Sequence, residues 1–594
     1  MKKLLKGVIL PGFIFFSVSA ATTFPLFLKL GSAIPGFFST DESFAMIWNA
    51  WRIKFAFLNH LSMNSTDLIA YPYGVEFFSN GLISYVWISI NYLLAIFTTP
   101  VLTYNIQVIM NFFLSAIFTY LLVFRLTKCR FAGIFSGIAF GLCPYLFIRA
   151  WQHLGETYVW PMPMFLWSAF CLKEDLRLRV KIIFILGLVL AAINYSVIYY
   201  TSVVFICLLL YLLVNWKSNL SYIRRIFFLS LIAAIVLLPQ FWPVIRNIMG
   251  FDKSSSASAW NVFQRPFEDL FAQSAKALSY FLPSATHPVF GGFTEQFVGT
   301  QIYGTSFTEH TLYLGWIPLI LAFIAFKKRK LIVNVKERSF INFFAVLAVC
   351  AWFFSQAPWW QIGALKIYMP SFFMYKVMPM FRAYCRFGIV VMLAVSVLAG
   401  FGLKILLDRF KSFNQKFAVA CFLCCLVLFE FWNYPPYKII DVSKAPSVYY
   451  WLKSQPKDTV IAEYPFNPDS PNELYRLYQI FYEKKMINYT IPTSEANMIA
   501  RTITKLSENN TRSYLKKIGV KYVLVHRDDY LNTDLVEEKK ELEKISQNKG
   551  LKLVKSYGAE ECPVKDFMCI QKTGPIDVYE IVAPVAIEPK IEEK

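Results

Sequence analysis

The chain has 594 residues, of which 56% are hydrophobic and 18% aromatic, and its mean hydropathy is +0.46. Its net charge of +21 would suit a nucleic-acid-binding protein, so the location of the charge decides between the classes. From Pro435 onward 24 basic residues face 23 acidic ones, whereas residues 1–434 hold 35 basic and 15 acidic residues. That excess lies in short loops between apolar runs, which is typical of membrane proteins and excludes nucleic acid as a partner.

Long apolar runs recur from Leu4 to Trp432. A bilayer requires about 20 apolar residues per helix, and the runs are continuous rather than alternating, so they predict membrane helices. The first run, "MKKLLKGVILPGFIFFSVSAATTFPLFL", is long enough for a full span. We therefore interpret it as an uncleaved first helix rather than a signal peptide.

Five basic clusters (125–130, 173–181, 215–225, 327–338 and 404–416) are predicted to be cytoplasmic. With the N-terminus inside and the C-terminus outside, they predict eleven spans, roughly 5–28, 103–124, 131–148, 158–172, 180–195, 197–214, 226–243, 311–326, 339–356, 387–404 and 417–433. The apolar stretch 80–97 would make a twelfth span, but that would move every basic cluster outside. We therefore predict a first external loop over 31–102 with interfacial or re-entrant pieces, and a second large external loop over 244–310.

The first loop begins with an acidic pair, Asp41 and Glu42, in "GFFSTDESFAMIWNAWRIKF". Its tryptophans are expected to anchor at the membrane interface. An acid at that place can act as a general base toward a hydroxyl or bind a divalent metal. The sequence "STDE" is also a good helix start, so capping of the next helix is an equally compatible interpretation.

Other polar residues gather on the predicted external face. The stretch "RAWQHLGET" offers Arg149, His153 and Glu156, which could bind a phosphate and a sugar hydroxyl or simply lie at the interface. Arg382 and Arg386, in "FRAYCRF", are expected on one helical face and suit a lipid-linked phosphate or anionic headgroups. His287 and Glu309 border the second large loop as weaker candidates for a polar site, and their spacing matches no metal template.

Residues 435–594 alternate helix-like stretches with the strand-like runs "TVIAEY", "KYVLVH" and "DVYEIV". They predict a C-terminal extracytoplasmic α/β domain following a transmembrane domain over 1–434. In an oxidising compartment Cys562 and Cys569 could form a local disulfide.

The sequence carries no Walker loop, GxGxxG, HExxH or GxSxG motif. Mid-span charges and internal repeats, which a transporter would need, are also missing from the pattern.

The arrangement of these features resembles a known superfamily. "STDESFAMIWNAWRIKFAF", "YPYGVEFFSNGL", "YLLVFRLTKCRFAGIFSGIAFGLCPYLFIRAWQH" and "FRAYCRFGIVVMLAVSVLAGFGL" are similar to stretches of GT-C-fold integral membrane glycosyltransferases, and more narrowly of the YfhO-type bacterial membrane proteins. "APSVYYWLKSQPKDTVIAEYPF" and "YLKKIGVKYVLVH" look like parts of the tail domain of that group. The tail has no WWD-type motif, which argues against an oligosaccharyltransferase.

The resemblance implies inverting transfer of a sugar from a polyprenyl-phosphate-linked donor to an envelope polysaccharide, glycolipid or protein at the external leaflet of the cell membrane. Asp41 matches the catalytic base of the first loop, with Glu42 beside it, and Arg382, Arg386 or Arg149 would stabilise the phosphate charge. No cofactor beyond the donor lipid is certain, and a divalent metal is possible. The alternatives are a flippase or transporter of lipid-linked saccharide, and a non-catalytic protein of envelope assembly.

Overall fold

The computed structural model describes residues 2–36, 41–77, 84–214, 216–249, 264–433, 437–468, 472–491, 494–531, 536–561 and 572–582. Contacts divide the chain into two compact units. Unit 1 comprises residues 1–29, 84–89 and 105–438, and unit 2 comprises 30–83, 90–104 and 439–594. Most of the predicted first external loop therefore groups with the C-terminal residues rather than with the membrane helices.

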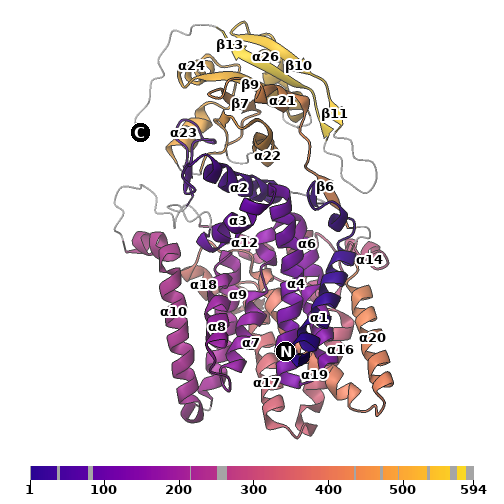
Figure 1. Ribbon diagram of the computed structural model, residues 1–594. Coiled ribbons are helices and arrows are strands. Elements are labelled where there is room, and N and C mark those ends of the chain that lie inside the picture. Colours follow the sequence, from indigo (N-terminus) through magenta and orange to yellow (C-terminus); the bar gives the residue numbers. More distant parts are fainter. Residues whose placement is uncertain are drawn as a thin grey trace. The chain divides into compact units, whose positions relative to one another are not determined.

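Unit 1 is built mainly from helices (Figure 1). Its longer helices are α1 (Lys2–Thr22), α4 (Pro100–Thr127), α5 (Arg130–Gly141), α6 (Pro144–Gln152), α7 (Pro161–Cys171), α8 (Leu178–Ala191), α9 (Tyr195–Leu213), α10 (Trp216–Ile248), α16 (Trp316–Lys328), α17 (Val335–Phe354), α19 (Gly388–Leu407) and α20 (Phe413–Glu430). Its short elements are η1 (Leu26–Leu28), η2 (Leu154–Thr157), α12 (Asp269–Ala272), α13 (Ala277–Phe281), α14 (Gly291–Glu295), α15 (Phe307–His310), η3 (Arg329–Leu331), β4 (Trp359–Ile362), β5 (Leu365–Tyr368), α18 (Pro370–Val377) and η4 (Tyr384–Phe387). Helix α3 (Tyr85–Phe97) begins in unit 1 and continues into unit 2, and α4 begins in unit 2 and continues into unit 1 from Asn105.

Seven helical segments of the described chain are long and apolar enough to cross a membrane, as expected for a membrane protein. They are Pro100–Thr127, Arg130–Gln152, Tyr195–Leu213, Trp216–Trp242, Val335–Phe354, Tyr384–Leu407 and Phe413–Glu430. Each overlaps one of the eleven predicted spans. The other four predicted spans contain α1, α7, α8 and α16, whose apolar parts are shorter than the roughly 20 residues that a span needs. Their crossing, and the orientation of the chain, remain predictions.

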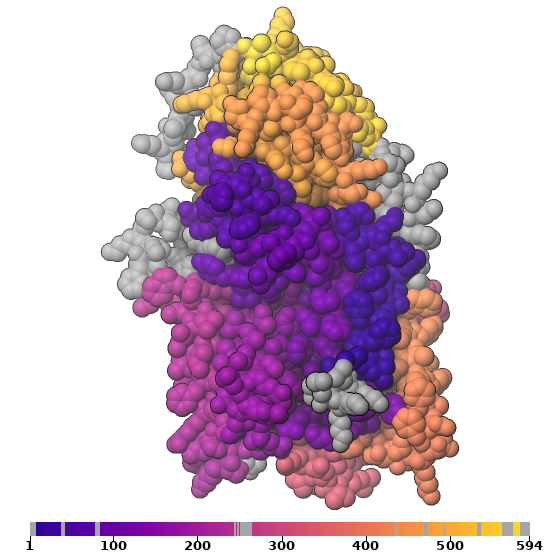
Figure 2. All heavy atoms as spheres, viewed as in Figure 1, coloured from indigo at the N-terminus to yellow at the C-terminus, as the bar shows by residue number. Residues whose placement is uncertain are grey.

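Helix α19 is buried over most of its length, and its neighbours approach it closely. A Cβ at Gly402 would lie 2.0 Å from the carbonyl oxygen of Leu321, and one at Gly400 would lie 2.4 Å from the Ser136 Oγ. Small residues of this kind let membrane helices pack backbone to backbone. Helices α10 and α20 stand at opposite edges of the unit and expose apolar side chains over most of their length, as helices facing lipid do (Figures 1 and 2).

Unit 2 contains a five-stranded mixed sheet in the order β10-β13-β9-β7-β8. Strand β7 runs parallel to β8 and β9, whereas β13 is antiparallel to β9 and β10. The three strand-like runs of the tail are confirmed as β7, β9 and β13. The tail elements are β6 (Ile439–Asp441), α21 (Ser447–Lys453), β7 (Val460–Tyr464), α22 (Glu473–Tyr482), β8 (Lys485–Met486), α23 (Glu495–Thr502), α24 (Asn509–Lys517), β9 (Val520–His526), α25 (Arg527–Leu531), α26 (Val536–Ser546), β10 (Leu551–Tyr557), β11 (Glu560–Glu561), β12 (Lys572–Thr573) and β13 (Ile576–Ile581).

The first-loop part of unit 2 packs against this sheet and its helices. Its elements are β1 (Ala33–Pro35), α2 (Asp41–Leu58), β2 (Ser65–Thr66) and β3 (Val75–Glu76), and β1 pairs with β6. Helix α2 lies on α22, and the Trp48 indole donates to the Gln479 side chain at 2.7 Å. Trp48 and Trp51 are both buried in a core shared with tail residues. The prediction that these tryptophans anchor at the membrane interface is therefore wrong, because their partners are protein side chains.

Candidate functional site

A cluster of charged side chains is buried in unit 1 where several helices end or begin. Arg149 lies in the last turn of α6, Glu156 in η2, Glu309 in α15 and Arg386 in η4, just before α19. The C-terminal end of the segment Arg130–Gln152 and the N-terminal end of the segment Tyr384–Leu407 therefore both lie at the cluster. Two antiparallel helices are expected to meet in this way at one face of a membrane bundle. Ionisable groups at such a position are expected to be functional.

Arg386 is the centre of this cluster. Its Nε and Nη2 donate to the two carboxylate oxygens of Glu309 at 2.9 and 2.6 Å, which is a bidentate pair. Its Nη1 donates to Glu156 at 2.6 Å. All three nitrogens of this guanidinium are therefore engaged by carboxylates.

Arg149 shares Glu309 with Arg386 but is less completely paired. Its Nη2 donates to the Glu309 carboxylate at 2.7 Å, and its guanidinium lies 5.1 Å from the centre of the Tyr145 ring. Among the residues that the structure describes, the Nε and Nη1 atoms of Arg149 and the Tyr145 hydroxyl have no hydrogen-bond partner, although these atoms are buried. Arg149 thus offers N–H donors to a further acceptor, which is the arrangement expected of an anion site.

Three more side chains border the cluster. The Tyr200 hydroxyl donates to Glu156 at 2.9 Å, the Cys385 thiol lies 3.6 Å from Glu309, and the His153 Nε2 lies 3.9 Å from Glu309. Sequence reasoning found His153 but missed Tyr200 and Cys385. A tyrosine and a cysteine within apolar helices give no local signal that they contact a charge.

The electrostatics of Glu309 follow from its two arginines. Burial opposes ionisation of this carboxyl, but the charges of Arg149 and Arg386 and their hydrogen bonds hold its pKa well below its usual range. Two guanidinium groups against two carboxylates make the cluster neutral as a whole. The arrangement can accept an anion at Arg149 without leaving a carboxylate unpaired.

The structure brings together Arg149, His153, Glu156, Glu309 and Arg386 from the sequence-predicted residues. Arg382 lies apart: it is exposed and pairs with Asp269 at 2.9 Å. The expected shared helical face of Arg382 and Arg386 is wrong, because the chain between them is not one α-helix.

His287 is bound to backbone groups rather than to the cluster. Its Nε2 lies 2.8 Å from the Phe429 carbonyl oxygen, and its Nδ1 accepts from the backbone N–H groups of Val289 and Phe290. Burial lowers the pKa of His287 below its usual value. These contacts give His287 a structural part in holding its loop.

The first-loop acids belong to unit 2. Helix α2 begins at Asp41, in agreement with the helix start predicted from "STDE", and Glu42 follows in its first turn. The capping residues before Asp41, the Asp41 side chain, and the candidate disulfide of Cys562 and Cys569 lie outside the described part of the chain. Within the described ranges there is no group of three or more His, Cys, Asp or Glu that could hold a metal, so the suggested divalent metal gains no support.

Comparisons with known proteins bear on the fold. No family model and no curated protein match the sequence. Among solved structures, the arabinofuranosyltransferase AftD from Mycobacteria is similar with a TM-score of 0.56 and 14% identity, over 98% of this chain and 40% of AftD. The structure of an AftD mutant gives a TM-score of 0.52 at 14% identity, over 98% and 42%. This chain therefore spans less than half the length of AftD.

A third structure, the oligosaccharyltransferase of Archaeoglobus fulgidus, has a TM-score of 0.49 and 11% identity, over 89% of this chain and 70% of that protein. We base no argument on a similarity of that size. At 14% identity the likeness to AftD shows a shared GT-C fold and nothing beyond the fold. The narrower resemblance to YfhO-type proteins remains a prediction.

Proposed function

We propose that this protein is a membrane glycosyltransferase of the GT-C type, which moves a sugar from a polyprenyl-phosphate-linked donor to an acceptor of the cell envelope. The fold shared with AftD, an arabinofuranosyltransferase, supports the class of reaction. The single observation that carries the donor class is the buried Arg149, whose Nε and Nη1 find no hydrogen-bond partner within the described part of the chain.

Arg149 suits the donor phosphate better than the two other arginines suggested by the sequence. Arg386 already donates from all three nitrogens to glutamates, and Arg382 is an exposed partner of Asp269. Because Arg149 is fully buried, we expect a phosphate to reach it only after neighbouring side chains shift. Glu309 and Arg386 would then act as positioning residues that fix the orientation of Arg149.

In the proposed reaction an acceptor hydroxyl oxygen attacks the anomeric carbon of the donor from the face opposite to the phosphate. The new C–O bond forms while the bond from that carbon to the phosphate oxygen breaks, and the phosphate leaves with the electron pair. The hydroxyl proton passes to a carboxylate acting as general base. Arg149 offsets the negative charge that grows on the phosphate, which lowers the barrier.

Asp41 is our proposed base. It is the first residue of α2, where the positive end of the helix dipole favours an ionised carboxylate. Glu42 would be a weaker substitute. The roles of Asp41 in unit 2 and Arg149 in unit 1 rest on separate observations and are tested by separate variants.

The test is made in a host strain that lacks the gene and carries a plasmid copy. With Asp41→Asn we expect sugar decoration of envelope material to fall about 10²–10⁴-fold, the usual effect of losing a general base. Decoration is measured by hydrolysis and mass spectrometry of the envelope, and protein level and membrane insertion by immunoblot. Asp408→Asn, an exposed acid after α19, serves as the matched control.

Unchanged decoration with Asp41→Asn would remove Asp41 from the mechanism. Unchanged decoration in the strain that lacks the gene would reject the enzyme itself and favour a non-catalytic part in envelope assembly. Glu42→Gln should leave most of the decoration in place, and an equal loss from both variants would argue for a shared structural role of the acidic pair.

A further inference from the structure

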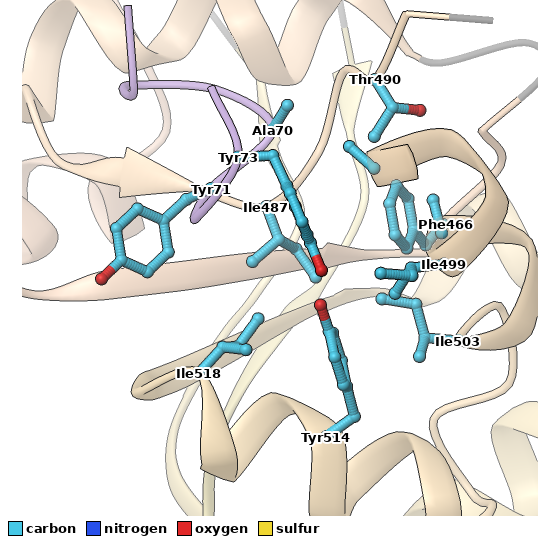
Figure 3. A pocket seen from close by; sticks show the side chains of 12 residues that line it. Ala70, Tyr71, Tyr73, Phe466, Ile487, Thr490, Ile499, Ile503, Tyr514 and Ile518 are labelled. Atoms are coloured by element: carbon cyan, nitrogen blue, oxygen red, sulfur yellow. The ribbon is translucent and has the colours of Figure 1, made fainter. Parts of the chain in front are cut away.

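A small hollow in unit 2, between Tyr73, Ile487 and Tyr514, is almost filled by its own side chains (Figure 3). The space that remains suits about one water molecule, so we place no ligand there. The hairpin of β4 and β5 in unit 1 is a different kind of surface. It follows the candidate membrane helix α17, and all of its residues from 361 to 368 are exposed.

One face of the hairpin is entirely apolar. The strands pair antiparallel, with Trp360 opposite Ile367 and Ile362 opposite Leu365. Side chains alternate between the two sides of a strand and paired residues share a side, so these four side chains lie on one face. Ile362 and Leu365, at the tip, are 64% and 62% exposed. Apolar side chains of this size gain free energy when they leave water.

The other face fixes the hairpin to unit 1. Trp359 stacks on the Phe267 ring at a centroid distance of 5.7 Å and meets the Phe271 ring edge-on at 4.8 Å. Tyr368, opposite Trp359, packs on the Phe372 ring of α18 at a centroid distance of 4.6 Å. Because these rings hold one face against unit 1, the apolar face points away from them.

The apolar face continues an exposed side of α17. The Trp360 ring centre lies 6.2 Å from that of Phe353, in the last turn of α17. Val346, Val349 and Phe353 recur three and four residues apart, so they share one side of the helix. Val346 and Val349 are 58% and 54% exposed, and only 33% of the most apolar stretch of α17 is buried. Exposed apolar side chains on a membrane helix face lipid, and the hairpin extends this surface beyond the end of the helix.

Basic side chains accompany this surface. Lys366 is exposed on the other face of the hairpin, and Lys376 is exposed on α18. Residues 357–377 contain these two lysines and no acidic residue. Phe373 and Val377 of α18 are 58% and 67% exposed. Apolar and aromatic side chains beside lysines match the boundary between lipid headgroups and acyl chains.

We propose that the β4–β5 hairpin and α18 form an interfacial anchor, which dips into the bilayer leaflet at the C-terminal end of α17. Ile362 and Leu365 reach the acyl chains, while Lys366 and Lys376 bind the phosphates of anionic lipids. The paired strands stay at the level of the headgroups, because their outer edges expose backbone groups that hydrocarbon cannot satisfy. The proposal does not depend on sugar transfer, since it concerns how unit 1 is held in the membrane.

The experiment uses the full-length protein in nanodiscs that contain equal amounts of phosphatidylcholine and phosphatidylglycerol. The photo-reactive amino acid p-benzoyl-phenylalanine replaces Leu365 in one variant and Ile362 in a second, and lipid adducts are counted by mass spectrometry after illumination. We expect lipid adducts at both positions, as at Val349 of α17, which is the positive control. Leu553 on the edge strand β10 of unit 2 is the matched negative control, because it is 52% exposed.

The lipid composition of the adducts tests the part of the lysines. At Leu365 the phosphatidylglycerol adducts should exceed the phosphatidylcholine adducts roughly fivefold, which is the effect of one lysine near an anionic surface. Lys366→Gln combined with Lys376→Gln should make the two adducts equally frequent. Lys521→Gln, an exposed lysine of unit 2, is the control and should leave the ratio unchanged.

Lipid adducts that are no more frequent at Leu365 and Ile362 than at Leu553 would overturn the proposal. Adducts to a second copy of the chain in place of lipid would also overturn it, because the hairpin would then be a contact between copies. A lipid ratio that stays the same after both lysine substitutions would reject anionic lipid as the partner.

Discussion

The charged cluster of unit 1 and the Gln479 network of unit 2 hold buried polar side chains in different ways, although unit 2 also buries the Glu463–His526 pair. In unit 1 two arginines and two glutamates pair with one another, so every charge depends on a particular partner. In unit 2 the buried Gln479 amide is neutral: it accepts from Trp48 and donates to the carbonyl oxygens of Leu68 and Lys484, each at 2.7 Å. Removing one partner of a buried ion pair leaves an uncompensated charge, whereas removing a neutral group leaves only unsatisfied dipoles. The charged cluster should therefore tolerate substitution far less.

Glu309→Ala should have the largest effect on stability. It removes the carboxylate that pairs with both Arg149 and Arg386 and leaves Glu156 to face Arg386, and the loss of a buried partner costs about 3–5 kcal/mol. The free energy of unfolding is measured by chemical denaturation in mixed micelles. Glu295→Ala, an exposed glutamate of the same unit, is the control and should change it by less than about 0.5 kcal/mol. Equal effects from the two variants would contradict the ionic cluster.

Acid should weaken the same contacts by protonating Glu309. Its folded-state pKa is held below the unfolded value of about 4.3, so its contribution to stability is complete above that pH and is lost as the pH falls through the folded-state pKa. The effect should be smaller than that of Glu309→Ala, because the side chain remains in place. Unfolding of wild type and Glu309→Gln is compared between pH 6 and pH 3 (about the range where an ordinary glutamate titrates). If the free energy of unfolding changes with pH in the same way for wild type and Glu309→Gln, the assignment of an ionised Glu309 to the folded protein is contradicted.

Gln479→Ala tests the neutral network of unit 2. We expect a loss of about 1–3 kcal/mol from the unsatisfied groups left behind. Amide hydrogen exchange at residues 68–71 should become faster, because Gln479 binds the Leu68 carbonyl oxygen. The exposed Gln547→Ala is the control. If exchange at 68–71 does not change, Gln479 does not hold the first loop against the tail.

Arg382→Gln should have the smallest effect. Its pair with Asp269 is partly exposed to solvent, and such pairs contribute about 0–1 kcal/mol. Arg386→Gln, four residues further along, should cost several times more because it removes the arginine that pairs with Glu156 and one of the two arginines that pair with Glu309. The free energy of unfolding of the two variants is compared by chemical denaturation. Similar losses in both would mean that burial does not make Arg386 more important for stability than Arg382.

The sequence predicted much of this architecture because apolar runs and alternating patterns are local signals. The seven long helices and the strands β7, β9 and β13 fall where those patterns place them. The external-face argument also selected Arg149, His153, Glu156, Glu309 and Arg386 before any contact among them was known. Their chain separations, such as the 230 residues between Glu156 and Arg386, give no hint of pairing.

The position of the first loop could not be predicted in the same way. An aromatic stripe on a helix fits a membrane interface and a protein core equally well, and the partner of Trp48 lies 431 residues away. Tyr200 likewise looks like one more aromatic residue of an apolar helix until its bond to Glu156 is seen. Such choices depend on tertiary contacts that no local pattern encodes.

The central claim is transfer of a sugar from a lipid-linked phosphate, and one measurement tests it most directly. Membranes of the host are labelled so that their own polyprenyl-phosphate sugars carry the label, and the purified protein is added with envelope acceptor. With wild type, label should leave the lipid fraction and appear in glycosidic linkage on the acceptor, whereas Arg149→Gln should leave it in the lipid. Label that crosses the membrane without forming a new glycosidic bond, or equal transfer by Arg149→Gln, would contradict the account.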